Sequence, residues 1–207
     1  MIQEIIAIID RSGSMHGKES DTIGGINSTI EELKNNKENE IIKFSLKFFD
    51  DKEFLKIRSL DIENIRPLLT TDLKPRGQTA LLDAMGNTIQ YFLNKKILHP
   101  NSFDTCIIYI ATDGFENCSK KFNNESIKNL INEAKKYSIE ILYLGANQDA
   151  ILESSKFGLD STQALNYDET TENIESAYRS AARVAKRYRS GNRVEFLKTE
   201  RSQSVKD

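Results

Sequence analysis

The sequence predicts an α/β domain: a three-layer, doubly wound and mostly parallel sheet with one antiparallel edge strand and helices on both faces. Apolar runs of strand length alternate along the chain with segments whose apolar residues recur at helical spacing. Several of the strand-like runs are almost continuously apolar, which is typical of parallel strands buried on both faces. One run follows the Asp50-Asp51 turn directly and can return antiparallel as a hairpin.

The first half of the chain begins with an apolar run and then a helical pattern. Ile23, Ile26, Ile30 and Leu33 recur at helical spacing and form one apolar face. Thr79 is expected to cap or open a later helix, whose buried stripe includes Leu82. The expected elements are strand 2–9, helix 21–35, strand 40–49, edge strand 53–60, a short helix within 61–69 and loop 70–78.

The second half repeats the alternation. Cys106 lies inside an apolar run and is expected to be a small buried side chain. Asn147, Gln148 and Asp149 follow a strand and are expected to cap the next helix. The expected elements are strand 103–112, helix 124–137, strand 139–144, helix 149–157, strand 161–167 and helix 171–188.

Composition limits the classes of protein to consider. The chain has 207 residues, 38% of them apolar, and a formal net charge of −2, so it has no general attraction to nucleic acid or an anionic membrane. The apolar runs are too short for a membrane helix, the N-terminal run lacks a basic leader, and two cysteines make no disulfide framework. We therefore expect a cytoplasmic protein with one domain over residues 1–190 and a flexible polar tail over residues 191–207.

Polar side chains follow the ends of expected strands at three places. Asp10, Ser12 and Ser14 lie just past the first strand, Thr79 lies just before a helix, and Asp113 lies just past strand 103–112. In an open α/β sheet, binding sites form outside the carboxyl ends of the strands. We expect these two carboxylates and three hydroxyls to meet at one end of the sheet.

The donor types of this group indicate which cation it can hold. All five side chains offer hard oxygen ligands, which disfavours zinc or copper. Mg²⁺ prefers near-octahedral oxygen coordination with one or two carboxylates and some water, whereas Ca²⁺ prefers more oxygens and bidentate carboxylates. The prediction is a Mg²⁺ site, with Mn²⁺ or Ca²⁺ as alternatives.

These residues resemble a known family. Asp10-Arg11-Ser12-Gly13-Ser14, with Gly77-Gln78-Thr79 and Thr112-Asp113-Gly114, resembles the metal-ion-dependent adhesion site (MIDAS) of von Willebrand factor type A domains. The resemblance covers about residues 1–190 and implies a Rossmann-like fold. The stretches TDGFENCS (112–119) and LGANQDA (144–150) are also similar to a less characterised bacterial and phage subgroup.

The resemblance implies a role for each site residue. Ser12 and Ser14 would bind the ion directly, Thr79 directly or through water, and Asp10 and Asp113 through water. An Asp or Glu of a partner protein would complete the coordination, so the implied function is metal-dependent protein binding and not catalysis. Further residues that could support the site or contact a partner are Arg11, His16, Gly77, Gln78 and Glu116.

Other interpretations compete with this one. D-x-S-x-S can be a capped helix start, and metal-activated water could make the chain a phosphoester hydrolase or nucleotide-processing accessory. Residues 176–207 hold nine Lys/Arg and three Asp/Glu, so a nucleic-acid accessory is another alternative. A solvated helix face also explains the basic positions of that segment, which include Arg179, Arg183, Lys186, Arg187 and Arg189.

Overall fold

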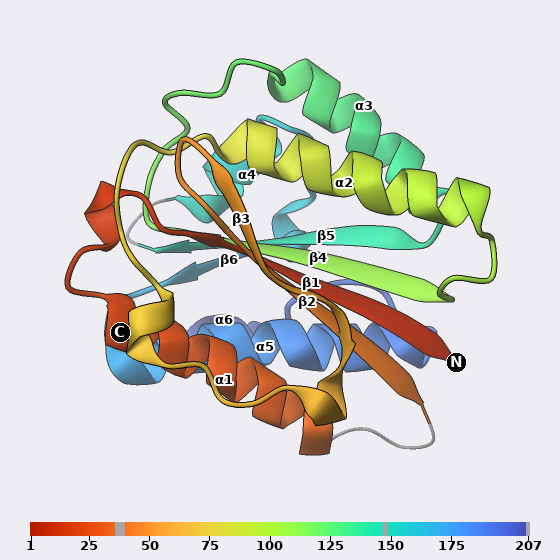
Figure 1. The fold of residues 1–207 in the computed structure, drawn as a ribbon, viewed down its shortest axis with the longest axis horizontal. Coiled ribbons are helices and arrows are strands. Elements are labelled where there is room, and N and C mark those ends of the chain that lie inside the picture. The colour runs from red at the N-terminus through yellow and green to blue at the C-terminus, as the bar shows by residue number, and fades with distance from the viewer. Residues whose placement is uncertain (36–39, 147–148, 206–207) are drawn as a thin grey trace.

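A six-stranded sheet lies between two layers of helices in the computed structural model, which describes residues 1–35, 40–146 and 149–205 (Figure 1). The strand order is β3-β2-β1-β4-β5-β6; the β2–β3 pair is antiparallel, and the other pairs of this sheet are parallel. The predicted doubly wound sheet with one antiparallel edge strand is therefore confirmed. The strands are β1 (Ile2–Asp10), β2 (Ile41–Phe49), β3 (Glu53–Asp61), β4 (Thr105–Thr112), β5 (Ile139–Ala146) and β6 (Ala164–Tyr167).

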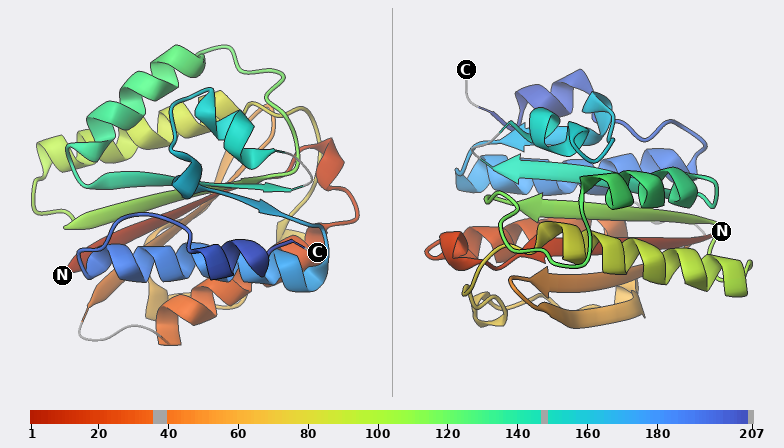
Figure 2. Two further views of the ribbon diagram at one scale, coloured as in Figure 1. Left: turned by 180° about the vertical axis from the view of Figure 1, so that it is seen from behind. Right: turned by 90° about the horizontal axis from the view of Figure 1, so that it is seen from above.

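The helices divide between the two faces of the sheet. In Figure 1, α2, α3 and α4 lie above the sheet, and α1, α5 and α6 lie below it; Figure 2 shows the same layers from behind and from above. The helices are α1 (Glu19–Asn35), α2 (Leu81–Leu98), α3 (Asn124–Lys135), α4 (Ala150–Ser155), α5 (Thr171–Arg189) and α6 (Lys198–Ser202). Among the described residues, no helix combines the length and the apolar character that crossing a bilayer demands.

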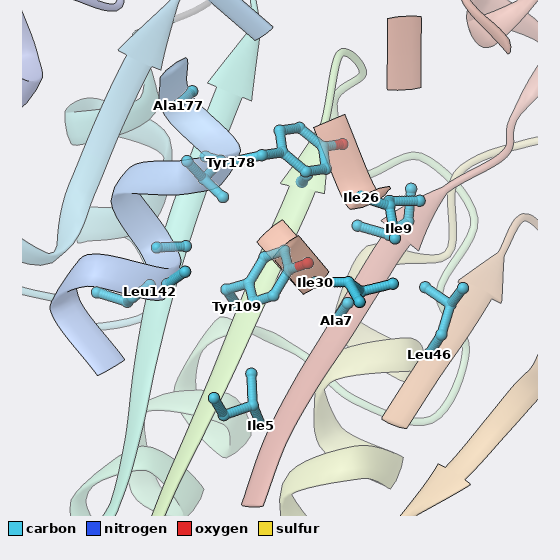
Figure 3. Close-up of a cluster of buried hydrophobic side chains, with 14 of the residues drawn as sticks. Ile5, Ala7, Ile9, Ile26, Ile30, Leu46, Tyr109, Leu142, Ala177 and Tyr178 are labelled. Atoms are coloured by element: carbon cyan, nitrogen blue, oxygen red, sulfur yellow. The ribbon is translucent and has the colours of Figure 1, made fainter. Parts of the chain in front are cut away.

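Successive side chains of the central strands point to opposite faces of the sheet, so they contribute to a hydrophobic cluster on each side. Ile5, Ala7 and Ile9 of β1 face α1 and α5, whereas Ile6 and Ile8 face the opposite layer. Figure 3 shows the first of these clusters, in which side chains of β1, β4 and β5 meet α1 and α5. Both faces of β1 are thus buried, as its continuous apolar sequence predicts.

The α1–α5 layer depends on one close approach. A Cβ on Gly25 would lie 2.9 Å from the ring of Tyr178, so a larger residue would push the two helices apart. Tyr178 is itself fully buried and packs edge-on against Tyr109 of β4 and Tyr167 of β6. This packing fixes α5 against the sheet.

Local details differ from the sequence expectations. The range 61–69 holds a single 3-10 turn, Ile62–Asn64, in place of a short helix. Ala80 takes the cap position of α2 with no side-chain hydrogen bond, so Thr79 does not cap that helix. Asp149 caps α4 by accepting from the Leu152 amide at 2.9 Å, whereas positions 147 and 148 lie outside the described residues.

The basic stripe on α5 is engaged within the fold. Arg179 pairs with Glu175, Arg183 with Glu32 of α1, and Arg187 with Glu200 of α6. Lys186 also has an interaction within the chain. Arg183 and Arg187 thus join α5 to neighbouring helices, and Arg179 pairs within α5, so these three positions of the stripe have carboxylate partners inside the fold.

The C-terminal segment also differs from the free tail that the sequence predicts. Phe196 is buried, the Phe196 amide donates to Thr162 O at 2.8 Å, and the Asp168 amide donates to Ser204 O at 2.9 Å. Arg187 donates to Glu200 from both terminal guanidinium nitrogens, Nη1 and Nη2, each at 2.8 Å. Residues 191–205 therefore run along the body of the domain and place α6 beside β6.

Candidate metal site

The five predicted site residues lie together beyond the carboxyl ends of β1 and β4. In Figure 1 these strand ends are at the left. Asp10 is the last residue of β1, and Asp113 directly follows β4, which pairs with β1. The chain crosses to opposite sides of β1 to form β2 and β4, so the strand order switches here. This is the position at which doubly wound sheets form binding sites.

Asp10 brings a buried negative charge to this point. Its Oδ1 accepts from the Ser12 amide at 2.6 Å, and its Oδ2 accepts from Thr112 Oγ1 at 2.6 Å. Burial raises the pKa of the Asp10 carboxyl to about 6, although the hydrogen bonds from Thr112 and Ser12 oppose that rise. A bound divalent cation would supply the positive charge that this carboxylate needs.

The serine hydroxyls bridge the two aspartates. Ser12 Oγ and Ser14 Oγ lie 3.0 Å apart, and Ser14 Oγ donates to Asp113 Oδ1 at 2.7 Å. Neighbouring oxygens of an octahedral Mg²⁺ complex with bonds of about 2.1 Å are about 3 Å apart. The spacing of the two serines therefore fits adjacent positions on one such ion.

Thr79 faces the same point from a third loop. A Cβ on Gly114 would lie 3.2 Å from Thr79 Oγ1 and 3.7 Å from both Asp10 Oδ2 and Ser14 Oγ. Oxygens from three separate segments thus surround one small space, and a side chain at position 114 would intrude on it. The convergence predicted from the sequence is present in the fold.

Two glycines let the first and second loops approach each other. The Gly13 amide donates to Gly77 O at 3.2 Å, and a Cβ on Gly13 would lie 3.4 Å from that oxygen. Gly77 has a φ of +69°, and a Cβ there would lie 2.5 Å from Asp51 Oδ1. We therefore assign Gly77 to positioning Thr79, two residues further on.

Arg11 turns away from the site. Its Nε lies 2.8 Å from Oδ2 of Asp50, which is buried at the end of β2 and also pairs with Arg76 at 2.9 Å. Burial alone would raise the pKa of Asp50, but hydrogen bonds from Arg76 and the Lys52 amide and the charge of Arg11 hold it below its usual value. This cluster joins the loops that carry Ser12 and Thr79, so Arg11 supports the site without facing a partner.

Glu116 also has a positioning role. Its carboxylate accepts from the amides of Leu82 and Cys118 at 2.9 Å and of Ser119 at 2.6 Å. Asn117 adds a reciprocal pair: Thr79 N donates to Asn117 Oδ1 at 2.9 Å, and Asn117 N donates to Thr79 O at 3.1 Å. The loop after Asp113 is thus fastened to the start of α2, beside Thr79.

Lys18 adds a cation that the sequence analysis did not assign to the site. Its Nζ lies 2.5 Å from Asp113 Oδ2 and also forms an ion pair with Glu169, which follows β6. Burial lowers the pKa of Lys18, but the bonds to Asp113 and Glu169 outweigh that effect and raise it. The ammonium therefore remains charged across the physiological range.

The rim of the site is exposed. Ser14, His16, Gln78 and Phe115 are accessible, and Phe115 is 58% exposed beside the glycine that borders the oxygen cluster. His16 lies 3.5 Å from Glu19 and is turned to solvent. A partner can therefore approach over these side chains to reach the oxygens below.

Hydroxyl donors distinguish this site from clustered His, Cys and carboxylate centres. Within the described ranges, no group of three or more His, Cys, Asp or Glu side chains is placed to hold a metal ion. The five converging side chains are instead two aspartates, two serines and one threonine. This donor set fits a hard cation that keeps some of its water.

Sequence comparison finds no matching family profile and no matching curated protein. Structure comparison finds the vWF domain of a type V pili tip protein from Porphyromonas gingivalis, with a TM-score of 0.63 at 11% identity, covering 94% of this chain and 98% of that one. A von Willebrand factor type A protein from Catenulispora acidiphila matches with a TM-score of 0.62 at 14% identity, over 89% of this chain. This chain has the von Willebrand factor type A fold.

This chain spans less than half the length of some of the proteins that it matches. The chain spans 46% of a mussel byssus protein, proximal thread matrix protein 1, at a TM-score of 0.60 and 14% identity, and 42% of the Catenulispora protein. Another structure of the mussel protein is described with zinc in its MIDAS motif. The likeness, at these identities, establishes the fold of this chain.

Proposed function

We propose that this chain is a divalent-metal-dependent protein-binding module. Asp10, Ser12, Ser14, Thr79 and Asp113 would hold Mg²⁺, and an Asp or Glu of a partner protein would complete the coordination. The convergence of oxygens from three loops at the strand-order switch carries this proposal. Mn²⁺ and Ca²⁺ are alternative ions, and the zinc-containing mussel structure supports divalent-metal binding in this fold.

Each proposed ligand has a defined task. Ser12 and Ser14 would bind through their hydroxyls, and Thr79 would bind directly or through water. Asp10 and Asp113 would balance the charge of the ion and orient its water. A cation held mainly by neutral hydroxyls keeps enough positive charge to attract a further carboxylate, and more strongly in a partly desolvated site than on an open surface.

Binding explains the arrangement better than hydrolysis does. A hydrolytic site needs a base placed to take a proton from the metal-activated water. Here Asp10 accepts from Thr112 and Ser12, Asp113 is held by Ser14 and Lys18, and Glu116 accepts from backbone amides. These carboxylates are engaged in shaping the loops.

Metal titration tests the proposal directly. We expect wild-type protein to bind Mg²⁺ in calorimetry, and Thr79→Ala and a Ser12→Ala/Ser14→Ala double variant to lose at least about tenfold in affinity, since each removes an oxygen ligand. Ser20→Ala, an exposed position on α1, is the matched control and should bind like wild type. Equal affinity in all of these proteins would exclude the assigned ligands.

Partner binding forms the second half of the test. Capture of an interacting protein should require Mg²⁺, and should fall away in EDTA and in Thr79→Ala while persisting in Ser20→Ala. Capture unchanged by EDTA would remove the metal from recognition. The cytoplasmic location stays a prediction, which fractionation of the native cell would test.

A further inference from the structure

The two oxygens of the Asp113 carboxylate have different partners, and Lys18 is one of them. Asp113 Oδ1 accepts from Ser14 Oγ at 2.7 Å and faces the proposed metal ligands. Asp113 Oδ2 instead lies 2.5 Å from Lys18 Nζ, and Glu169 holds the same ammonium from the other side. One oxygen of this carboxylate therefore belongs to the metal site and the other to an ion pair.

The three charged groups come from separate loops, each fixed by the fold. Lys18 directly precedes α1, and there its amide donates to Met15 O at 3.1 Å and its carbonyl accepts from Thr22 N at 2.9 Å. Asp113 follows β4, and Glu169 lies between β6 and α5. A flexible lysine tethered to two carboxylates from distant loops has a defined position beside the site.

Partial burial strengthens the electrostatic interactions of these three charged side chains. The side chains of Lys18 and Glu169 are 27% and 25% exposed, and that of Asp113 is 3% exposed. Charges in such surroundings interact more strongly than an exposed surface pair, because less water screens them. The ammonium therefore contributes to the electrostatic potential at the adjacent oxygen cluster.

The ammonium of Lys18 determines the net charge of the site when a divalent cation is bound. Asp10, Asp113 and Glu169 carry three negative charges when ionised, and Lys18 offsets one of them. A divalent cation then makes the group neutral. Without Lys18, the same cation would leave a net negative charge, which would repel the carboxylate of an incoming partner.

We propose that Lys18 tunes the metal site by weakening the hold on the divalent cation and strengthening its attraction for an external carboxylate. Glu169 keeps the ammonium in place beside Asp113. This inference rests on the proposed metal-binding function and adds to it a residue that sets the balance between metal affinity and ligand affinity. It predicts changes of opposite sign on removing one charge.

The affinity for Mg²⁺ and the affinity for a carboxylate can both be measured in the same variants. Mg²⁺ binding is measured by calorimetry at low ionic strength, and acetate, as a simple carboxylate probe, is titrated onto Mg²⁺-saturated protein and followed by amide NMR shifts. For Lys18→Met we expect Mg²⁺ to bind at least about fivefold more tightly and acetate about threefold more weakly. For Lys18→Arg, which keeps the charge, we expect both affinities within about twofold of wild type.

A matched control separates local charge from net charge. Lys56 pairs with Asp72 at 2.6 Å and is 33% exposed, but it lies on β3. Lys56→Met should leave both affinities within about twofold of wild type, because its charge lies outside the site and is screened by solvent. Thermal unfolding of every variant shows whether the fold is retained.

A double-mutant cycle tests the role of Glu169. Glu169→Gln removes a negative charge, which weakens Mg²⁺ binding, but it also releases the ammonium, which opposes that loss. If Glu169 holds the ammonium in place, the loss of Mg²⁺ affinity should therefore be larger in the Lys18→Met background, where there is no ammonium to release. Unchanged or weaker Mg²⁺ binding in folded Lys18→Met overturns the inference, as does tightening of equal size in Lys18→Arg. A wild-type protein that binds neither Mg²⁺ nor Mn²⁺ overturns the proposed function as well.

Discussion

Asp10 is the residue at which metal binding and stability oppose each other. Its carboxylate is fully buried at the end of β1, and its hydrogen bonds come from a hydroxyl and an amide. The pKa of about 6, against an ordinary value of 3.8, means that folding favours the protonated form of this carboxyl relative to the unfolded chain. Each unit of pKa difference between the folded and unfolded states is worth about 1.4 kcal/mol, so the charge destabilises the protein at neutral pH.

Replacing Asp10 by Asn should therefore stabilise the protein when metal is removed. The amide can accept from Ser12 N and donate to Thr112 Oγ1, so both contacts of Asp10 can be kept. In EDTA at pH 7.5 we expect Asp10→Asn to raise the free energy of unfolding by up to about 3 kcal/mol. Urea denaturation measures this difference, and added Mg²⁺ should stabilise wild type alone.

The sign of the pH dependence follows from the direction of the shift. The folded pKa of Asp10 lies above the ordinary value of 3.8, so the native state binds more protons than the unfolded state between about pH 4 and 6. Wild-type stability falls as the pH rises through this window. The advantage of Asp10→Asn should be full above about pH 6 and vanish near pH 4; the same advantage at both pH values would contradict a charge effect.

At the scale of elements, the start of α2 organises the loop that follows β4. Asp83, in the first turn of α2, accepts from the amides of Lys120, Lys121 and Phe122, each at 2.9 Å. In return, Ser119 Oγ accepts from the Asp83 amide at 3.0 Å. These bonds and those of Glu116 hold the segment after Asp113 against the helix.

Asp83→Asn should loosen this loop without touching a proposed metal ligand. An amide in place of the carboxylate would set an N–H group against a backbone N–H, so we expect a loss of about 2 kcal/mol in the free energy of unfolding. Mg²⁺ affinity should also fall, because Asp113 is held less firmly. Glu125→Gln, an exposed charge change on α3, is the control for both measurements.

This prediction also has a definite pH dependence. Burial alone would raise the pKa of Asp83, but the three backbone hydrogen bonds hold it below the ordinary value. The stabilisation by Asp83 is thus present above about pH 4 and is lost as the pH falls through the lowered folded pKa. Urea denaturation at pH 7 and at pH 3 should show the difference from Asp83→Asn shrinking on acidification.

Sequence periodicity and side-chain geometry explain which elements could be predicted. The apolar runs of β1 and β4 identify strands buried on both faces, and the polar residues at their ends identify the edge at which Asp10 and Asp113 meet. The cap of α2 was not predictable in this way. Leu82 N donates to Glu116, a residue 34 positions away, and such a contact depends on the packing of two loops.

At the scale of the whole molecule, contacts between residues still further apart in the sequence could not be predicted either. The Lys18–Asp113 contact spans 95 positions and the Lys18–Glu169 contact spans 151. A lysine before a helix has the same local sequence signal whether it faces water or a carboxylate. Lys18 therefore lacked a signal that would assign it to the site, whereas Ser12, Ser14 and Thr79 each follow or precede a predicted element.

The C-terminal segment completes the molecule by covering an edge of the sheet. β6 is an edge strand, and an uncovered edge strand is free to pair with another chain. Glu200 of α6 is buried, binds Arg187 at 2.8 Å through both oxygens, and accepts from the Leu197 amide at 2.8 Å. This carboxylate links the segment to α5.

Glu200→Gln should release the segment and destabilise the domain. Breaking a buried ion pair costs about 3–5 kcal/mol, and because Arg187 is partly exposed we expect about 2 kcal/mol here. Hydrogen exchange should accelerate over residues 192–205, and sedimentation should show more self-association as β6 is uncovered. Lys198→Gln, an exposed change on the same helix, should affect neither. Unchanged exchange in Glu200→Gln would show that the apolar packing of Phe196 holds the segment without the ion pair.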